Sequence, residues 1–149
     1  MKKLILFLIF LLSASSANAE WILTGTDDVK KNFLKLPAKK SQNIIMLWEL
    51  NDYLSPQLYE NLNTFFSSTI TNTEIDCKNE SFRLSSVHFY SGNMQTGKII
   101  RSSTFSPKAK DYEMFHPVIP NSQIEYSMQI ACNKIKYLIK DKILYPLNN

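Results

Sequence analysis

The amino-acid sequence predicts an α+β fold: an antiparallel β-sheet of about five to six strands packed by one C-terminal α-helix, with the helix tied to the sheet by a disulfide. Three observations predict this fold. Residues 69–105 contain three segments of strand character separated by short turns. Residues 122–142 carry an apolar stripe at helical spacing. The chain also has two cysteines, Cys77 and Cys132.

The first 19 residues have the pattern of a secretory signal peptide. A basic start precedes an apolar run over residues 4–12, and small residues follow up to Ala17-Asn18-Ala19. The apolar run is too short for a permanent membrane span, although an uncleaved anchor is the alternative. We therefore expect residues 20–149 to form one exported domain, periplasmic or secreted to the cell surface. No cysteine stands beside the cleavage site, so no lipid anchor is expected there.

Composition excludes several classes of function. The chain has three glycines, too few and too scattered for a phosphate-binding loop or a dinucleotide-binding fingerprint. The formal net charge is +4, and loss of Lys2 and Lys3 with the signal peptide lowers it by two. An exported domain with so small an excess of positive charge is not expected to bind nucleic acid.

The N-terminal half contains two predicted strands and two ambiguous segments. Residues 21–24 predict a short first strand, and residues 43–51 predict a central strand because both of its faces are mostly apolar. Residues 26–40 fit either a short helix or a strand followed by a loop. Residues 53–66 fit either a short helix or an ordered loop.

A capping box marks the start of the C-terminal helix, because Ser122 is followed three residues later by Glu125. The apolar residues that follow recur every three or four positions, which predicts a helix from Ser122 to about Lys142. These residues are Ile124, Met128, Ala131, Ile135 and Leu138.

An even pair of cysteines in an exported protein predicts one disulfide between Cys77 and Cys132. Two buried free thiols are the alternative. Closing a loop of about 56 residues would stabilise the fold by about 4 kcal/mol on the chain-entropy model.

No residue constellation predicts a catalytic, metal or cofactor site. Glu74 and Asp76 fall on one face of a predicted strand, where they could act as an acid/base pair or lie on a solvated surface. His88 and His116 have no second histidine or acid at metal-ligand spacing. We expect a solvated sheet face and two structural histidines.

Four lysines follow the second cysteine and are the candidate partner-binding residues: Lys134, Lys136, Lys140 and Lys142. They could complement the dipole of the predicted helix, or they could form a basic patch for an acidic partner. Apolar residues among them favour contact with a partner protein or with a second copy of the chain.

Six short segments, in this order and spacing, resemble the surface-adhesin protein E family of Gram-negative bacteria. They are Trp21, MLWEL at 46–50, EIDC at 74–77, YSGNMQTG at 90–97, PVIPNS at 117–122, and Ala131-Cys132. The resemblance implies an antiparallel sheet with a C-terminal helix, no enzymatic activity and no cofactor.

The resemblance also implies an adhesin that binds host matrix or plasma proteins, with a homodimer as a candidate assembly. The family's namesake is lipid-anchored, but this chain lacks the cysteine for that attachment. The alternative is a periplasmic envelope-accessory or structural interaction protein. For the adhesin, we expect the exposed sheet edge, the aromatic residues Tyr53, Tyr59 and Phe65, and the basic helix to make the contacts.

Overall fold

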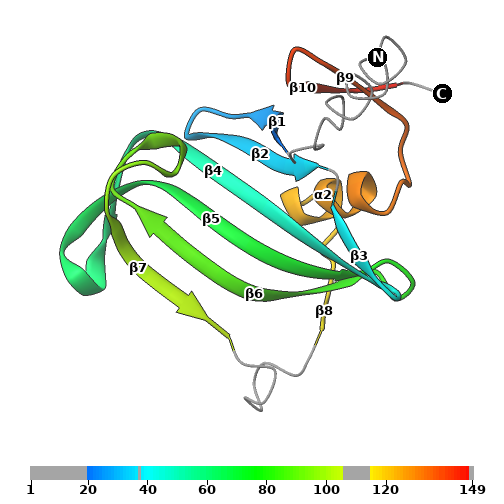
Figure 1. Cartoon of the computed structure of the whole chain (residues 1–149), viewed down its shortest axis with the longest axis horizontal. Coiled ribbons are helices and arrows are strands. Elements are labelled where there is room, and N and C mark those ends of the chain that lie inside the picture. The colour runs from blue at the N-terminus through cyan, green and yellow to red at the C-terminus, as the bar shows by residue number, and fades with distance from the viewer. Residues whose placement is uncertain (1–19, 37, 106–114, 148–149) are drawn as a thin grey trace, which may run out of the picture.

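The computed structural model of the chain describes residues 20–36, 38–105 and 115–147. The predicted signal peptide therefore lies outside the described residues. The described residues form one sheet of ten strands, two short 3-10 turns and one α-helix (Figure 1). The elements are β1 (Glu20–Thr26), β2 (Lys30–Leu36), β3 (Lys39–Ser41), β4 (Ile44–Tyr59), η2 (Glu60–Leu62), β5 (Thr64–Asp76), β6 (Ser81–Tyr90), η3 (Asn93–Gln95), β7 (Ile99–Thr104), β8 (His116–Pro117), α2 (Gln123–Ala131), β9 (Tyr137–Lys140) and β10 (Ile143–Pro146).

The strands follow the order β7-β6-β5-β4-β2-β1-β10-β9, while β3 pairs with β4 and β8 pairs with β6. The predicted three-stranded meander is confirmed as β5, β6 and β7. The prediction of five to six antiparallel strands is wrong, because β1 and β10 pair in parallel and the sheet is mixed. The additional strands come from segments without clear alternation in the sequence, above all the C-terminal one.

Both ambiguous segments of the N-terminal half are extended. Residues 26–40 contain β2 and the start of β3, so of the two interpretations the strand is confirmed. Residues 53–66 were expected as a short helix or a loop, but they form the far ends of β4 and β5. Only the three-residue turn η2 separates the two strands, and Asn63 closes it with a φ of 44°. We call residues 53–66 the hairpin arm.

The helix begins where the sequence predicts and ends earlier. The Ser122 side chain accepts a hydrogen bond from the Glu125 backbone N–H at 3.3 Å, which confirms the N-cap. The prediction that the helix continues to Lys142 is wrong, because Asn133 adopts a left-handed φ of 54°. The Lys134 N–H then donates to the Gln129 carbonyl at 2.8 Å, which closes a Schellman motif. The residues beyond it form the hairpin of β9 and β10.

The hydrophobic core lies between α2 and the sheet. Leu47 and Ile75 are fully buried on β4 and β5, and Ile130 of α2 is 1% exposed. Of the predicted apolar stripe, Met128 and Ala131 are buried in this core, whereas Leu138 lies outside the helix and is 54% exposed. In Figure 1, α2 covers one end of the sheet and the hairpin arm extends at the other end.

Candidate functional site

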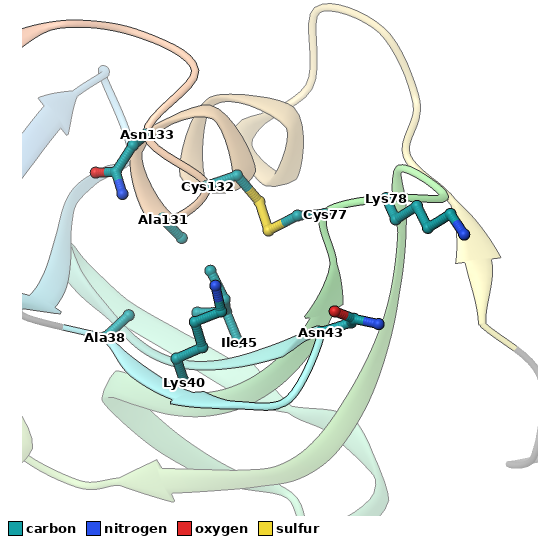
Figure 2. A pocket seen from close by; sticks show the side chains of 9 residues that line it. All are labelled: Ala38, Lys40, Asn43, Ile45, Cys77, Lys78, Ala131, Cys132 and Asn133. Atoms are coloured by element: carbon teal, nitrogen blue, oxygen red, sulfur yellow. A yellow bond between two sulfur atoms is a disulfide. The ribbon is translucent and has the colours of Figure 1, made fainter.

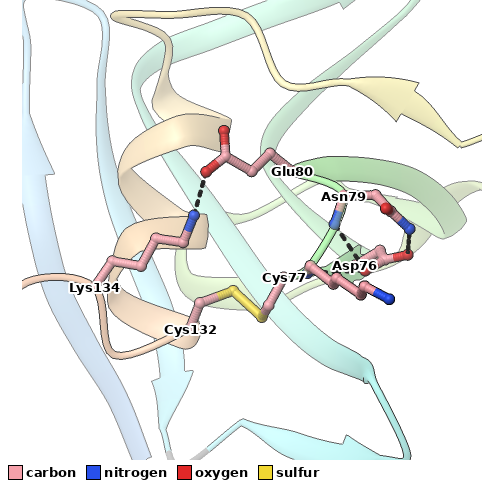
Figure 3. A network of polar contacts seen from close by, with 7 residues as sticks. Asp76, Cys77, Asn79, Glu80, Cys132 and Lys134 are labelled. Atoms are coloured by element: carbon pink, nitrogen blue, oxygen red, sulfur yellow. Dashed lines mark hydrogen bonds and ion pairs between the residues drawn. A yellow bond between two sulfur atoms is a disulfide. The ribbon is translucent and has the colours of Figure 1, made fainter.

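The disulfide joins the sheet to the helix at the covered end of the molecule. Cys77 directly follows β5 and Cys132 is the C-cap of α2, and their sulfur atoms are bonded at 2.01 Å. The predicted disulfide is therefore present, and neither cysteine is a free thiol. Figures 2 and 3 show the bridge running from the end of the last helical turn to the β5–β6 turn.

Polar contacts hold the β5–β6 turn beside the disulfide (Figure 3). The Asp76 carboxylate accepts hydrogen bonds from the Lys78 and Asn79 N–H groups and, at 2.7 Å, from the Asn79 side chain. These bonds hold the pKa of Asp76 below its usual range. On the other side of the bridge, Lys134 forms an ion pair with Glu80. The network fixes the geometry of a turn and holds no group free to react.

A hollow of about 430 Å³ opens beside the disulfide (Figure 2). It lies between β3, the start of β4 and the C-terminal end of α2. The described residues that line it are Ala38, Lys40, Asn43, Ile45, Cys77, Lys78, Ala131, Cys132 and Asn133. Lys40 points into the hollow, whereas Lys78 extends away from it (Figure 2). This lining contains no carboxylate, histidine or hydroxyl group that could act together with Lys40.

One carboxyl group is buried under the helix, and the sequence patterns do not single it out. Glu49 of β4 accepts a hydrogen bond from the Ser127 hydroxyl of α2 at 2.6 Å and another from the Thr73 hydroxyl of β5 at 3.2 Å. Burial raises the pKa of Glu49, and these two bonds only partly oppose the shift. Because Ser127 is fully buried, Glu49 is a polar contact between sheet and helix rather than an open site.

Glu74 and Asp76, which were weighed as an acid/base pair and expected on a solvated face, do not form a common site. Glu74 forms an ion pair with Arg83 of the neighbouring strand at 2.6 Å, while Asp76 holds the β5–β6 turn. The His88 ring lies 2.5 Å from the Ser102 hydroxyl, and His116 is exposed on β8. Within the described residues, no three His, Cys, Asp or Glu side chains are close enough together to hold a metal ion.

The four lysines do not lie on a helix, which corrects the expectation of a basic helix. Lys134 follows α2 and pairs with Glu80, and Lys142 lies in the β9–β10 turn and pairs with Glu20 at 2.8 Å. Lys136 directly precedes β9, Lys140 is the last residue of β9, and both are exposed. The four lysines therefore lie after α2, beside and at the end of β9, and in the β9–β10 turn, rather than along one helix.

The hairpin arm carries an exposed apolar surface, of which only Phe65 was predicted from the sequence. We define the arm tip as Leu54, Leu58, Leu62 and Phe65. Each of these side chains is between 47% and 59% exposed. Leu58 and Phe65 are paired across the two strands. The density of large apolar residues around the polar turn at Glu60–Leu62 is the sequence signal that marks this surface.

An aromatic cluster supports the arm tip from the other face of the arm. The Phe66 ring packs edge-on against Tyr53 at 5.4 Å, against Phe89 of β6 at 5.0 Å, and against Tyr59 at 6.5 Å. Tyr53 and Tyr59, expected as exposed contact residues, belong to this packed cluster. Phe65 is 59% exposed, and its role as a contact residue stays a prediction.

The turn around η3 fixes the base of the arm. The Asp52 carboxylate accepts hydrogen bonds from the Met94 N–H at 2.6 Å and the Asn93 side chain at 3.1 Å. The Asn93 amide also donates to the Tyr53 carbonyl at 2.9 Å. These bonds tie residues 93–94 to the start of the arm, so the arm has a defined direction relative to the sheet.

In the part of the chain that the structure describes, no helix is both long and apolar enough to cross a bilayer.

Comparisons with known proteins identify a family. A family model described as "Surface-adhesin protein E" matches residues 21–133. The crystal structure of protein E from non-typeable Haemophilus influenzae resembles this fold with a TM-score of 0.50 and 12% sequence identity, over 81% of this chain and 79% of that chain. At that identity the similarity concerns the fold alone. No curated protein sequence matches the chain.

Proposed function

Because this chain belongs to the surface-adhesin protein E family, we propose that it is an exported, non-enzymatic protein that binds host matrix or plasma proteins through the arm tip. The family relationship supports the adhesin class, and the exposed arm supports the location of the contact. The hollow, the histidines and the paired acids offer no convergent reactive groups that would favour an enzyme.

The arm tip is the observation that carries this proposal. Four large apolar side chains lie exposed within a dozen residues of sequence, between Leu54 and Phe65. Exposed apolar clusters on soluble domains are typical of protein–protein contact sites, and aromatic residues dominate the energetics of such contacts. Phe65 and Leu58, adjacent across the two strands, are the expected anchor residues.

The arm is held in place before any partner binds, so little conformational entropy is lost when these residues make contact. The aromatic cluster packs one face of the arm, and Asp52 and Asn93 fix its base. A surface that is ordered before binding loses less conformational entropy on association. The geometry therefore favours contact by surface complementarity with an already folded partner.

The test compares the purified exported protein with the double variant Leu58→Glu/Phe65→Glu. Binding to immobilised laminin, as a matrix protein, and vitronectin, as a plasma protein, is measured by biolayer interferometry. We expect saturable binding by the unmodified protein and its loss in the variant. The matched control is Ile119→Glu, which places a charge at a residue that is 66% exposed elsewhere on the surface. Absence of saturable binding at micromolar concentration would contradict the proposal.

A cell-surface position is also part of the proposal, and a separate experiment tests it. Protease is added to intact cells, and the fate of the protein is compared with that of a periplasmic marker. Digestion with the marker intact supports an adhesin at the surface. Protection of both would contradict the surface position and favour the alternative, an envelope-accessory protein in the periplasm.

A further inference from the structure

The C-terminal hairpin forms one edge of the sheet and lies outside the family match. The family model ends at residue 133, whereas β9 and β10 span residues 137–146. The strand order ends with β1-β10-β9, so the hairpin moves the edge of the sheet from β1 outward to β9. The outer surface of β9 is therefore a feature of this chain in addition to the matched domain.

The hairpin is anchored to the domain at several points. The Leu23 N–H donates to the Lys142 carbonyl at 2.8 Å, and Leu23 is the register partner of Ile143. Leu144 is 5% exposed and belongs to the core beneath α2. The ion pair of Lys142 with Glu20 adds a contact to β1. These contacts hold β9 in place as an ordered strand.

The backbone of β9 presents hydrogen-bonding groups on its outer side. The Lys136 carbonyl accepts from the Leu147 N–H at 2.9 Å, so the backbone groups of Lys136 point inward toward the β10 side. Backbone groups alternate in direction along a strand, and those of Tyr137 and Ile139 therefore point outward. Among the described residues, β10 is the only strand that pairs with β9.

On one face of this edge strand, positively charged side chains alternate with an apolar one. Lys136, Leu138 and Lys140 share one face of the strand because strand side chains alternate. Leu138 is 54% exposed, and its cross-strand partner Tyr145 is 46% exposed. Within the described residues, neither Lys136 nor Lys140 takes part in a salt bridge, unlike Lys134 and Lys142. The face therefore carries two uncompensated positive charges on either side of an apolar pair.

We propose that β9 binds an extended segment of a partner protein as an added antiparallel strand, and that this segment has acidic, apolar and acidic residues at alternate positions. The acidic residues would lie opposite Lys140 and Lys136, and the apolar residue would lie opposite Leu138. Backbone hydrogen bonds to Tyr137 and Ile139 would supply affinity, and the side chains would supply selectivity. The inference rests on the proposed protein-binding function and gives the chemistry of a second contact.

The same pattern disfavours a second copy of this chain as the added strand. Antiparallel pairing of two β9 strands would bring lysines of both copies close together, and like charges on adjacent strands are destabilising. Lysines on an edge strand commonly protect a protein from such self-association. The same lysines that repel a second β9 strand would attract an acidic segment.

The test uses two synthetic peptides that differ only in charge. One contains Glu-Thr-Val-Thr-Glu and the other Lys-Thr-Val-Thr-Lys, each with neutral flanking residues. Binding to the full exported chain is measured by calorimetry, and hydrogen exchange is followed at single amides. We expect the acidic peptide to bind, to slow exchange of the Tyr137 and Ile139 amides, and to bind less tightly as salt is raised. We expect no such protection with the basic peptide.

Charge reversal on the protein completes the test. Lys136→Glu/Lys140→Glu should weaken binding of the acidic peptide by about tenfold or more, because two cross-strand charge pairs become repulsive. The matched control Lys39→Glu/Lys40→Glu, on the exposed strand β3, should bind like the unmodified chain. Circular dichroism confirms that each variant is folded. Equal binding to both peptides, or no added protection at Tyr137 and Ile139, would overturn the proposal.

The two proposals fail separately. The Leu58→Glu/Phe65→Glu variant should keep its affinity for the acidic peptide, since the arm lies at the other end of the sheet (Figure 1). Loss of peptide binding in that variant would also overturn the assignment to β9. Failure of the peptide to bind leaves the result with laminin and vitronectin unchanged.

Discussion

The two ends of this sheet are stabilised in different ways. At one end α2 covers β4 and β5, Leu47 and Ile75 are fully buried, and a disulfide joins helix to sheet. At the other end the hairpin arm is two strands held by an aromatic cluster, and its tip exposes Leu58 and Phe65. The covered end therefore supplies most of the stability, which leaves the arm end free to expose apolar surface for contact.

The disulfide should give the largest effect on stability. Cys77→Ser/Cys132→Ser releases a loop with a sequence separation of 55 residues, and the chain-entropy model predicts a loss of about 4 kcal/mol. Urea unfolding followed by tryptophan fluorescence measures the change, with the reduced unmodified protein as the control. A loss below about 1 kcal/mol would show that packing of α2 alone holds the covered end.

Phe66→Ala should give the next largest effect, although this residue lies in the arm. Phe66 is 8% exposed and contacts three other rings, so truncation is expected to cost about 3 kcal/mol. Urea unfolding measures the loss, and binding to laminin and vitronectin should also weaken because the arm loses its support. Unchanged stability would mean that the arm contributes nothing to the cooperative fold.

Glu49→Gln should alter how stability depends on pH at the covered end. Burial raises the pKa of Glu49 in the folded protein above its usual 4.5, so the folded state holds this proton more tightly than the unfolded state does. The Glu49 contribution to stability is present at low pH and is lost as pH rises from 4.5 through the raised pKa. The variant should lack this loss.

Urea unfolding at a series of pH values from 4 to 8 distinguishes the two proteins. Glu60→Gln, a change at an exposed residue of η2, is the matched control and should behave like the unmodified chain. Parallel pH profiles for Glu49→Gln and the unmodified chain would show that Glu49 reaches water in the folded state.

Phe65→Ala should have the smallest effect on stability and a clear effect on binding. Its side chain is 59% exposed, so the change in unfolding free energy should stay within about 0.5 kcal/mol. Binding to laminin and vitronectin should nevertheless weaken. Phe65 and the neighbouring Phe66 point to opposite faces of the arm, so Phe65→Ala should affect binding and Phe66→Ala should affect stability as well. Equal destabilisation by both substitutions would contradict this difference between the two faces.

Regular alternation and helix caps made much of the fold predictable. The meander of β5, β6 and β7 follows from alternating side chains and polar turns, and the Ser122 cap places the start of α2 correctly. The disulfide was predictable because the chain carries only two cysteines. The meander and the helix start depend on local patterns, and the disulfide depends on there being one possible pair of cysteines.

The C-terminal error has a definite physical cause. Ile135 and Leu138 continue the helical spacing, so periodicity alone extends the helix through β9. The stop signal is Asn133, a residue that tolerates the left-handed conformation at a helix end. The β9–β10 turn could not be predicted from its residue types. Asp141 and Lys142 adopt φ values of 50° and 62° at positions where Asn-Gly is usual.

The candidate site was less predictable than the fold. Lys136 and Lys140 were singled out by charge, but their place on an edge strand depends on pairing of β10 with the distant strand β1. Of the arm tip only Phe65 was predicted as a contact residue, because Ser55-Pro56 and the spacing of Leu58 and Leu62 resemble a helix start. Glu49 lies in the predicted central strand, but its partners come from β5 and α2, which local patterns do not bring to it.

The parallel pairing of β1 with β10 also has a consequence for the order of folding. Leu23 meets Ile143 across almost the whole length of the domain, so this contact carries a large loop-closure entropy. The meander and the helix form from segments that are closer in sequence. The pairing of β1 with β10 is therefore expected to form last. We expect the folding chain to pass through a state in which only the pairing of β1 with β10 has not yet formed.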